Sequence, residues 1–435
     1  MDQNNPRTHN VNNTQSPGPE RIRIIAAAVL LAVAIFIIAV RSCGDSEKKI
    51  IPSALSSPFK KGKPKGPADV VRHYSEREFN ETLADKETVT ASDKSYNVTL
   101  TVSPELQRKL YKLMVKYHPR CGAAVVIRPS TGEVLAAVSY RNDKEESFLP
   151  ESRNMLFWNE YPAASLFKIV TTAGVLEYNL MNTADGINVT GNLWTLYKRQ
   201  LQQDAPNRWS RLISMREAFT RSINPFFGKV GMYILGPDRL NTTAGKFLFN
   251  HPIAFDLPLG ASRYVPPNDP YEAAALACGF NSFTTISPIH AAMLAGAVVN
   301  NGKVANPKLF REITRDGKAV FNGGVDTMYS LITSATSKET MKVMSEVVKK
   351  GTARKGFAHL NRSRSFDNIR MGGKTGNLNS TSPRGRCDWF TGFAYDSRKP
   401  SDAIAVAVVT VHGPYWNVHS SYVGAEAINF YFSNR

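Results

Sequence analysis

A serine and a lysine stand three residues apart in an apolar stretch, at Ser165 and Lys168. Residues at this spacing lie on one face of a helix, so the hydroxyl and the amine can meet. A serine hydroxyl becomes a nucleophile when a neighbouring base accepts its proton, and a lysine removed from water can be that base. The pair is therefore a candidate nucleophile and base, although the spacing alone proves little. The same spacing occurs twice more, at residues 46–49 and 57–60, but in a polar segment that predicts no site.

Two further polar motifs follow this pair along the chain. Ser222 and Asn224 stand two apart where a helical stretch ends, and Lys374-Thr375-Gly376 lies in a glycine-rich strand pattern. The Ser-x-Asn pattern also recurs by chance, whereas Lys-Thr-Gly occurs once. Each motif alone is weak evidence for a catalytic site. The order of the three motifs, and the helices and strand that carry them, make the combined evidence strong.

Helix and strand patterns indicate how these motifs are positioned. The apolar run over residues 169–180 predicts that Ser165 stands at the N-terminus of a buried helix, where free N–H groups carry partial positive charge. Strands are expected over 122–127, 133–139, 371–377, 388–394 and 403–411, and helices over 104–117, 286–299, 338–350 and 421–432. Short connections favour antiparallel pairing, and the helices can cover both faces. The expected fold is α/β of the α+β type: a three-layer sandwich around a five-stranded antiparallel sheet. Residues 181–215 are expected to be irregular, and residues 379–386 a polar loop.

Composition limits the class of protein. The 435 residues, 42% of them hydrophobic, suffice for one large domain or two ordinary ones. A net charge of +18 suits nucleic acid, anionic lipid or an anionic polymer. No nucleic-acid motif is present, so a basic surface on a membrane-bound protein is favoured. The four cysteines and eight histidines show no paired spacing, so neither a metal, another cofactor nor a disulfide framework is expected.

The N-terminal region predicts a membrane anchor. Residues 24–40 are uninterrupted apolar residues between Arg23 and Arg41, at the short end of a bilayer span. A cleaved signal peptide is the alternative, but a long polar tail precedes the run and no small-x-small cleavage site follows it. Flanking charges leave the orientation open. The expected organisation is a disordered tail over 1–21, a transmembrane helix over 22–41, a linker and membrane-proximal segment over 42–95, and a catalytic domain over 96–435.

Over residues 97–432 the chain resembles the transpeptidase domain of penicillin-binding proteins. The resemblance rests on the three motifs in order, and on LTVSPELQ, GAAVVIRPSTGEVLAAVS, SPIHAAMLAGAVVNNG and GGKTGN followed by DWFTGFA. It implies a five-stranded antiparallel sheet between helical layers, with the site beside the strand that carries Lys-Thr-Gly.

The resemblance also implies a role for each motif residue. Ser165 would attack the carbonyl between the two terminal D-alanines of a peptidoglycan stem peptide. Lys168 would be the base, with its pKa lowered by burial and by Lys374 nearby. Ser222 would pass a proton to the leaving nitrogen, and Asn224 would hold Lys168 and the substrate amide.

The strand motif would bind the substrate. Lys374 and Thr375 would bind the terminal carboxylate, and Gly376 would let the peptide lie along the strand edge. The backbone N–H groups of Ser165 and Asn377 would form the oxyanion hole. An amine from a neighbouring stem would then accept the acyl group. Asn377 departs from the threonine common at this position, so side-chain contacts to the substrate carboxylate are expected to differ.

Alternatives remain open. A D,D-carboxypeptidase or a β-lactamase would hydrolyse the same acyl-enzyme, and a non-catalytic β-lactam sensor or division scaffold would keep only the fold. The expected partners are stem peptides, β-lactam antibiotics, the bilayer through residues 22–41 and a cell-wall synthesis complex, without nucleic acid. The resemblance implies a single-pass protein of the cytoplasmic membrane with an internal N-terminus and a periplasmic or extracellular domain. With only about fifty residues between span and domain, neither a glycosyltransferase domain nor a large pedestal is expected.

Overall fold

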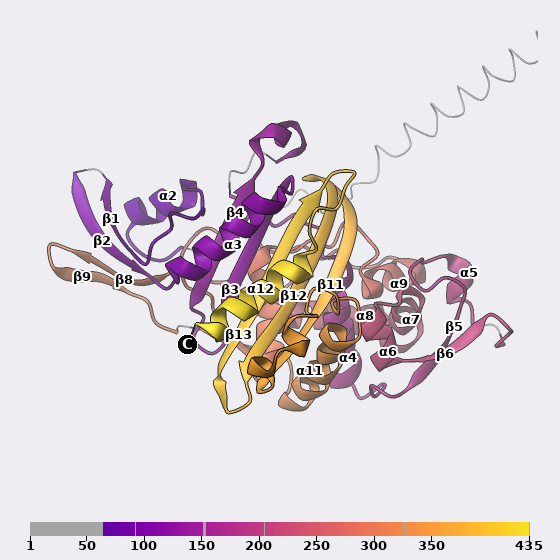
Figure 1. Cartoon of the computed structure of the whole chain (residues 1–435). Helices are drawn as coiled ribbons and strands as arrows, with labels where there is room; N and C mark the ends of the chain where they lie inside the picture. The colour runs from indigo at the N-terminus through magenta and orange to yellow at the C-terminus, as the bar shows by residue number, and fades with distance from the viewer. Residues whose placement is uncertain (1–63, 92, 151–153, 204, 326, 435) are drawn as a thin grey trace, which may run out of the picture. The chain divides into compact units, whose positions relative to one another are not determined.

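The computed structural model describes residues 64–91, 93–150, 154–203, 205–325 and 327–434. Within Phe59–Arg435, which form one compact unit, the elements run from α2 (Ala68–Glu76) to α12 (Ser420–Ser433) (Figure 1). The predicted tail, the predicted transmembrane helix and the first part of the predicted linker lie outside the described residues and stay predictions. Among the residues that are described, no helix combines the length and apolar content that a membrane span requires.

A five-stranded sheet occupies the centre of this unit. Its strand order is β11-β12-β13-β3-β4, and every neighbouring pair is antiparallel. The strands are β11 (Ile369–Thr381), β12 (Arg384–Asp396), β13 (Lys399–His412), β3 (Cys121–Ile127) and β4 (Val134–Arg141). The predicted five-stranded antiparallel sheet is therefore confirmed. Strand β13 joins the late strands to the early hairpin, and β11, which carries Lys-Thr-Gly, is an edge strand.

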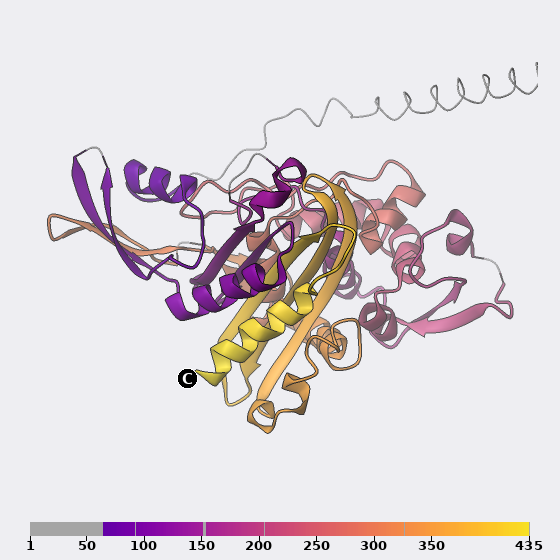
Figure 2. The same cartoon turned by 45° about the horizontal axis from the view of Figure 1, so that its top comes forward.

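Helices pack on both faces of this sheet. Phe390 of β12 faces α12, because a Cβ at Gly424 would lie 2.4 Å from its ring. Thr391, the next residue, donates its hydroxyl to the Ala291 carbonyl in α10 (Pro288–Val299) at 2.6 Å. Neighbouring strand residues point to opposite faces, so α12 and α10 cover opposite faces. Helix α3 (Pro104–Tyr117) lies beside α12 in both views (Figures 1 and 2).

A second sheet contains part of the predicted linker. Strands β1 (Lys86–Ala91) and β2 (Lys94–Leu100) form a hairpin, and β2 pairs with β8 (Phe310–Arg315), which pairs with β9 (Lys318–Asn322). Helix α2 contributes Val70 and Tyr74 to the buried core. Ordered structure thus begins well before residue 96, although the domain boundary itself stays a prediction.

The remaining helices and strands connect the elements described above. They are η2 (Asp143–Phe148), η3 (Ala164–Leu166), α4 (Phe167–Glu177), β5 (Gly186–Thr190), α5 (Lys198–Leu201), β6 (Ser210–Ser214), α6 (Met215–Arg221), α7 (Asn224–Lys229), η4 (Val230–Leu235), α8 (Gly236–Lys246), α9 (Pro270–Cys278), β7 (Lys303–Ala305), β10 (Met328–Ser330), α11 (Ser334–Lys349), η5 (Leu360–Arg362) and η6 (Arg364–Phe366).

Two local predictions were wrong. Residues 181–215 contain the β5–β6 hairpin rather than irregular structure throughout. Residues 379–386 are not a loop, because β11 and β12 remain paired up to Thr381 and Arg384. Many side chains at this end of the β11–β12 hairpin are exposed, so the sequence there is polar although the backbone is paired.

Candidate active site

Ser165 lies in the short turn η3, directly before the buried helix α4. The preceding residue, Ala164, has φ 48, a left-handed conformation that is strained for a residue with a Cβ. The segment after α9 packs over this turn: Gly279 has φ +69, and a Cβ there would lie 1.8 Å from the Ala164 carbonyl oxygen. The Ala163 N–H also donates to the Thr284 carbonyl at 2.8 Å. These contacts hold the nucleophile's turn in place.

Lys168 lies one helical turn after Ser165 and is fully buried. Its Nζ is 2.7 Å from the Ser165 Oγ, 2.8 Å from the Asn224 Oδ1 and 2.9 Å from the Cys278 carbonyl oxygen. The amide and carbonyl oxygens can only accept hydrogen bonds. A neutral amine would therefore donate its two protons to them and direct its lone pair at the Ser165 hydroxyl. This is the geometry of a base that accepts the serine proton.

Burial lowers the pKa of both lysines of the site. It lowers the pKa of Lys168 to about 8. Burial, and then the charge of Lys168, lowers the pKa of Lys374 well below its ordinary value. Of the two causes expected for the lowered pKa of Lys168, burial is the larger.

The second motif places a hydroxyl between these amines. Ser222 ends α6 in a left-handed conformation, with φ 58. Its Oγ accepts a hydrogen bond from the Lys374 Nζ at 2.8 Å and lies 3.4 Å from the Lys168 Nζ. Asn224 begins α7, and its Nδ2 donates to the Trp194 carbonyl at 2.8 Å. That bond orients the amide so that Oδ1 faces Lys168.

Strand β11 runs past the nucleophile at Gly376. A Cβ there would lie 3.2 Å from the Ser165 backbone nitrogen, so glycine is what allows this close approach. The fully buried Lys374 also donates its Nζ to the Thr375 carbonyl at 2.8 Å. Asn377 follows on the same strand with an exposed side chain. The structure thus gathers Ser165, Lys168, Ser222, Asn224, Lys374, Thr375 and Gly376, with Asn377 next to them along the strand.

Several groups of the site were missed by sequence reasoning. The hydroxyls of Thr352 and Thr375 lie 2.5 Å apart. The helix-ending Gly351 was the only nearby signal, and it marks a turn rather than a site. Trp194 and Cys278 contribute backbone carbonyls, which no side-chain pattern can indicate.

Among the described residues, no group of three histidine, cysteine or carboxylate side chains is placed to hold a metal ion. The buried thiols of Cys121, Cys278 and Cys387 are not in disulfides. The cluster offers a nucleophile, a base and a hydroxyl that can carry a proton, which suits acyl transfer.

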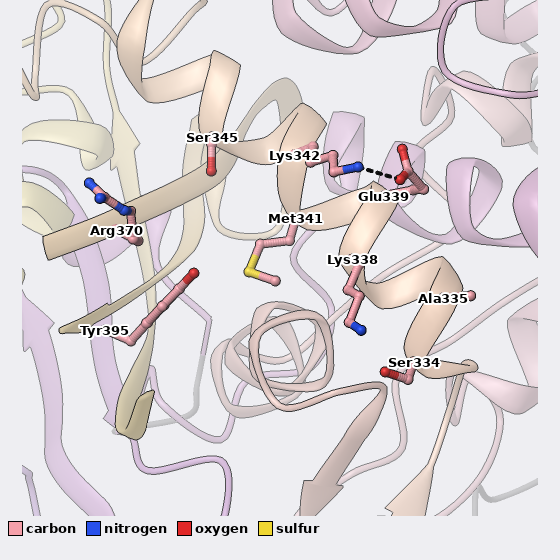
Figure 3. Close-up of a pocket in the computed structure, with 9 residues that line it drawn as sticks. All are labelled: Ser334, Ala335, Lys338, Glu339, Met341, Lys342, Ser345, Arg370 and Tyr395. Carbon is pink, nitrogen blue, oxygen red and sulfur yellow. Dashed lines mark hydrogen bonds and ion pairs between the residues drawn. The ribbon is translucent and has the colours of Figure 1, made fainter. Parts of the chain in front are cut away.

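A separate pocket of about 670 Å³ lies between α11 and the ends of β11 and β12 (Figure 3). Arg370 and Tyr395, which face each other across the two strands, form one side of it. On the α11 side, Lys342 is paired with Glu339 at 2.6 Å. None of the motif residues lines this pocket, so it is distinct from the catalytic cluster.

A buried amine beside a serine hydroxyl, at the edge of a five-stranded antiparallel sheet, suits acyl transfer through the serine. The family model of the penicillin binding protein transpeptidase domain matches residues 122–428, which is more than half of the chain. The chain belongs to this family.

Individual relatives are similar at modest identity. Stage V sporulation protein D of Bacillus subtilis is 26% identical over 72% of this chain, but the match covers only 49% of that protein's length. Peptidoglycan D,D-transpeptidase PbpA of Mycolicibacterium smegmatis is 26% identical, over 78% of this chain and 72% of the relative. The structure of penicillin-binding protein A from M. tuberculosis as an imipenem acyl-enzyme complex matches with a TM-score of 0.59 and 23% identity, covering 76% of this chain and 79% of that one.

Proposed function

We propose that this protein is a peptidoglycan D,D-transpeptidase, a serine acyltransferase that cross-links stem peptides. The observation that carries the proposal is the 2.7 Å contact between the Ser165 Oγ and the buried Lys168 Nζ, at the open edge of β11. Family membership and relatives named peptidoglycan D,D-transpeptidase support it.

The first half of the reaction forms an acyl-enzyme. The Ser165 Oγ attacks the carbonyl carbon between the terminal D-alanines while its proton passes to neutral Lys168. The backbone N–H groups of Ser165 and Asn377 bind the oxyanion of the tetrahedral intermediate. The proton then moves through the Ser222 hydroxyl to the D-alanine nitrogen. The C–N bond breaks, D-alanine leaves, and an ester remains on Ser165.

The second half transfers the acyl group. An amine of a neighbouring stem attacks the ester carbonyl, gives its proton to Lys168 and forms the cross-linking amide as the Ser165 oxygen leaves and takes the proton back. Water in place of the amine would make the protein a D,D-carboxypeptidase. A β-lactam ring opens onto Ser165 by the same first step, and rapid hydrolysis of that adduct would make the protein a β-lactamase.

The proposed setting is the outer side of the cytoplasmic membrane. Peptidoglycan cross-linking takes place there, and the apolar residues 24–40 suit a single-pass anchor with the N-terminus inside. The net charge of +18 suits anionic headgroups or wall polymers near this surface. Assembly with other cell-wall synthesis proteins belongs to the same proposal.

A purified-protein assay tests the activity. The chain is mixed with a D-Ala-D-Ala stem peptide and an amine acceptor, and mass spectrometry separates the cross-linked dimer from the hydrolysed monomer. Dimer that disappears in Ser165→Ala and persists in Ser57→Ala, the serine of another S-x-x-K copy, supports the proposal. Hydrolysed monomer without dimer would indicate a carboxypeptidase. Penicillin that acylates Ser165 and leaves within seconds would indicate a β-lactamase, and a folded chain active toward neither reagent would indicate a scaffold.

A further inference from the structure

The pocket between α11 and the ends of β11 and β12 has a basic residue on each of its two walls. On the sheet side, Arg370 is in register with Tyr395, so both side chains point to the same face of the sheet. On the helix side, Lys338 lines the pocket. In Figure 3 the Tyr395 hydroxyl and the Lys338 amine lie on either side of Met341. The pocket therefore combines cations with apolar surface.

No ion pair within the described residues neutralises these two cations. Arg370 donates one N–H to the Asp367 carbonyl at 3.0 Å, which leaves its other N–H groups available. Lys342, by contrast, is paired with Glu339 at 2.6 Å. Arg370 and Lys338 are both exposed. An anion that enters the pocket therefore meets two available positive charges, one from each wall.

Two hydroxyl groups add neutral donors to the same pocket. The hydroxyls of Tyr395 and Ser345 line it, and neither has a hydrogen-bond partner in the part of the chain that the structure describes. Each can donate one hydrogen bond to an anion. Because the donors come from a strand on one side and a helix on the other, they suit a tetrahedral phosphate diester, whose oxygens point in different directions, better than a planar carboxylate.

The segment that joins the two walls is also basic. Residues 349–364 run from the end of α11 to η6, just before β11, and contain no aspartate or glutamate. Their exposed lysines and arginines are Lys349, Lys350, Arg354, Lys355, Arg362 and Arg364. Within the described residues, Lys350 alone among these is paired with a carboxylate, that of Glu346. A flexible polyanion can follow cations on a helix, on turns and inside a pocket, whereas a flat bilayer reaches only those that lie in one plane.

The size of the pocket favours a ligand larger than a bare ion. Its volume of about 670 Å³ is within the range of roughly 300–1,000 Å³ that is usual for small-molecule sites. The Met341 side chain and the Tyr395 ring can contact the carbon skeleton that carries the charge. A short polyol phosphate unit provides both the anion and the carbon skeleton.

We propose that this pocket binds a glycerol phosphate unit of an anionic wall polymer, with Arg370 and Lys338 on the phosphate and residues 349–364 along the rest of the polymer. Arg370 and Gly376 lie on the same face of β11, roughly 20 Å apart at the rise of a strand. Polymer held in the pocket therefore keeps the catalytic cluster close to the wall. The inference uses the proposed setting outside the membrane, where such polymers lie, but it does not depend on acyl transfer.

Binding of a fluorescein-labelled oligomer of glycerol phosphate tests the site. Fluorescence anisotropy gives the dissociation constant for the whole chain, for Lys338→Glu, for Arg370→Glu and for the double variant. The control is the double variant Lys94→Glu/Lys318→Glu, which has the same net charge but changes exposed lysines of β2 and β9 in the second sheet. The rate of Ser165 acylation by penicillin verifies that each variant is folded.

The expected result is a loss of affinity that is specific to the pocket. Each single charge reversal weakens binding several-fold, and Lys338→Glu/Arg370→Glu weakens it at least about tenfold, because two charge-assisted contacts become repulsive. The control variant weakens binding less than about threefold, through the long-range effect of net charge, and added salt removes this difference. Penicillin acylation stays at the rate of the parent protein.

Three results would overturn the site. Equal losses in the two double variants would show that net charge alone attracts the oligomer. Polyglutamate that competes as well as unlabelled oligomer at the same charge concentration would exclude the phosphate preference. If Lys338→Glu/Arg370→Glu still binds the oligomer but loses the extra vesicle binding that phosphatidylglycerol adds over neutral lipid, the pocket is a lipid headgroup site. A parent protein that binds the oligomer but is not acylated by penicillin would contradict the proposed function and leave the pocket in place.

Discussion

Burial of the Lys168 amine decides the pH at which Ser165 can react. Only the neutral amine can accept the serine proton, and its pKa is lowered to about 8. The neutral fraction rises with pH through this value, from roughly one tenth at pH 7 to nine tenths at pH 9. We expect the rate of acylation by penicillin to rise about tenfold over this range and then level off. A rate that stays flat between pH 6.5 and 9 would exclude Lys168 as the titrating base, and Lys168→Met should abolish acylation throughout.

Asn224 offers a second test of the same base. Asn224→Asp would place a carboxylate where Oδ1 now lies, 2.8 Å from the Lys168 Nζ. An adjacent opposite charge raises a lysine pKa by about 1–3 units, so the pH midpoint should move upward and the rate at pH 7 should fall at least about tenfold. The measurement is the pH profile of acylation, with Asn224→Ala as a neutral control. A midpoint that remains near pH 8 in Asn224→Asp would argue against this electrostatic link.

The side chains with catalytic chemistry were predictable because three short motifs follow one another in order, each on a helix or strand that the apolar pattern predicts. Ser165 and Lys168 meet since one helical turn separates them, and this is readable without coordinates. The carbonyls of Trp194 and Cys278 were not predictable, because any residue has one. The 2.7 Å hydrogen bond from Arg386 of β12 to the Asn377 Oδ1 was not predictable either, because it depends on the register of β11 and β12.

At the level of elements, two glycines of β11 should behave oppositely. Gly376→Ala would put a methyl group 3.2 Å from the Ser165 backbone nitrogen. It should lower acylation about 10²-fold or more by disturbing an oxyanion donor, with little change in melting temperature. Gly373→Ala would place its methyl 2.4 Å from the buried Phe390 ring. It should lower the melting temperature by several degrees through overpacking, while the protein that folds still reacts.

The two measurements are the acylation rate per folded molecule and thermal unfolding. If Gly376→Ala reacts normally, the close approach of β11 to Ser165 is not required for catalysis. If Gly373→Ala melts at the temperature of the parent protein, the Phe390 packing is looser than the structure indicates.

Apolar elements were easier to predict than exposed ones. Strand β3, residues 403–411 of β13 and nearly all of helix α10 are buried, so a largely apolar run marks each of them. The outer end of the β11–β12 hairpin carries many polar side chains, so its residue types are also typical of a loop. Pairing between distant segments, such as β2 with β8, leaves no local pattern at all.

On the scale of the whole molecule, the start of the folded unit can be located by truncation. A chain of residues 59–435 should react with penicillin at the rate of the full chain and melt at a similar temperature, because it keeps the whole compact unit. A chain of residues 96–435 lacks α2 and β1. It should melt at a lower temperature or aggregate, since Tyr74 packs on Phe310 with ring centroids 5.3 Å apart and β2 would lose its partner.

Calorimetry and penicillin acylation of the three chains provide the measurement. Equal melting temperatures for the two truncated chains would place the boundary near residue 96, as the sequence predicts. If only the chain of residues 96–435 melts at a lower temperature, the boundary of the folded domain lies before α2.

The position of β13 governs the order in which the protein can fold. This strand is made last among the strands, yet it lies between β12 and β3, and Ala405 pairs with Ile127 across most of the chain. Contacts between such distant segments make folding slow, because a long loop must close before they form. During synthesis the β3–β4 hairpin must therefore wait, with the edge of β3 unpaired, until residues beyond Lys399 emerge. The nucleophile, although encoded early, acquires the strand beside it only in the final stage of folding.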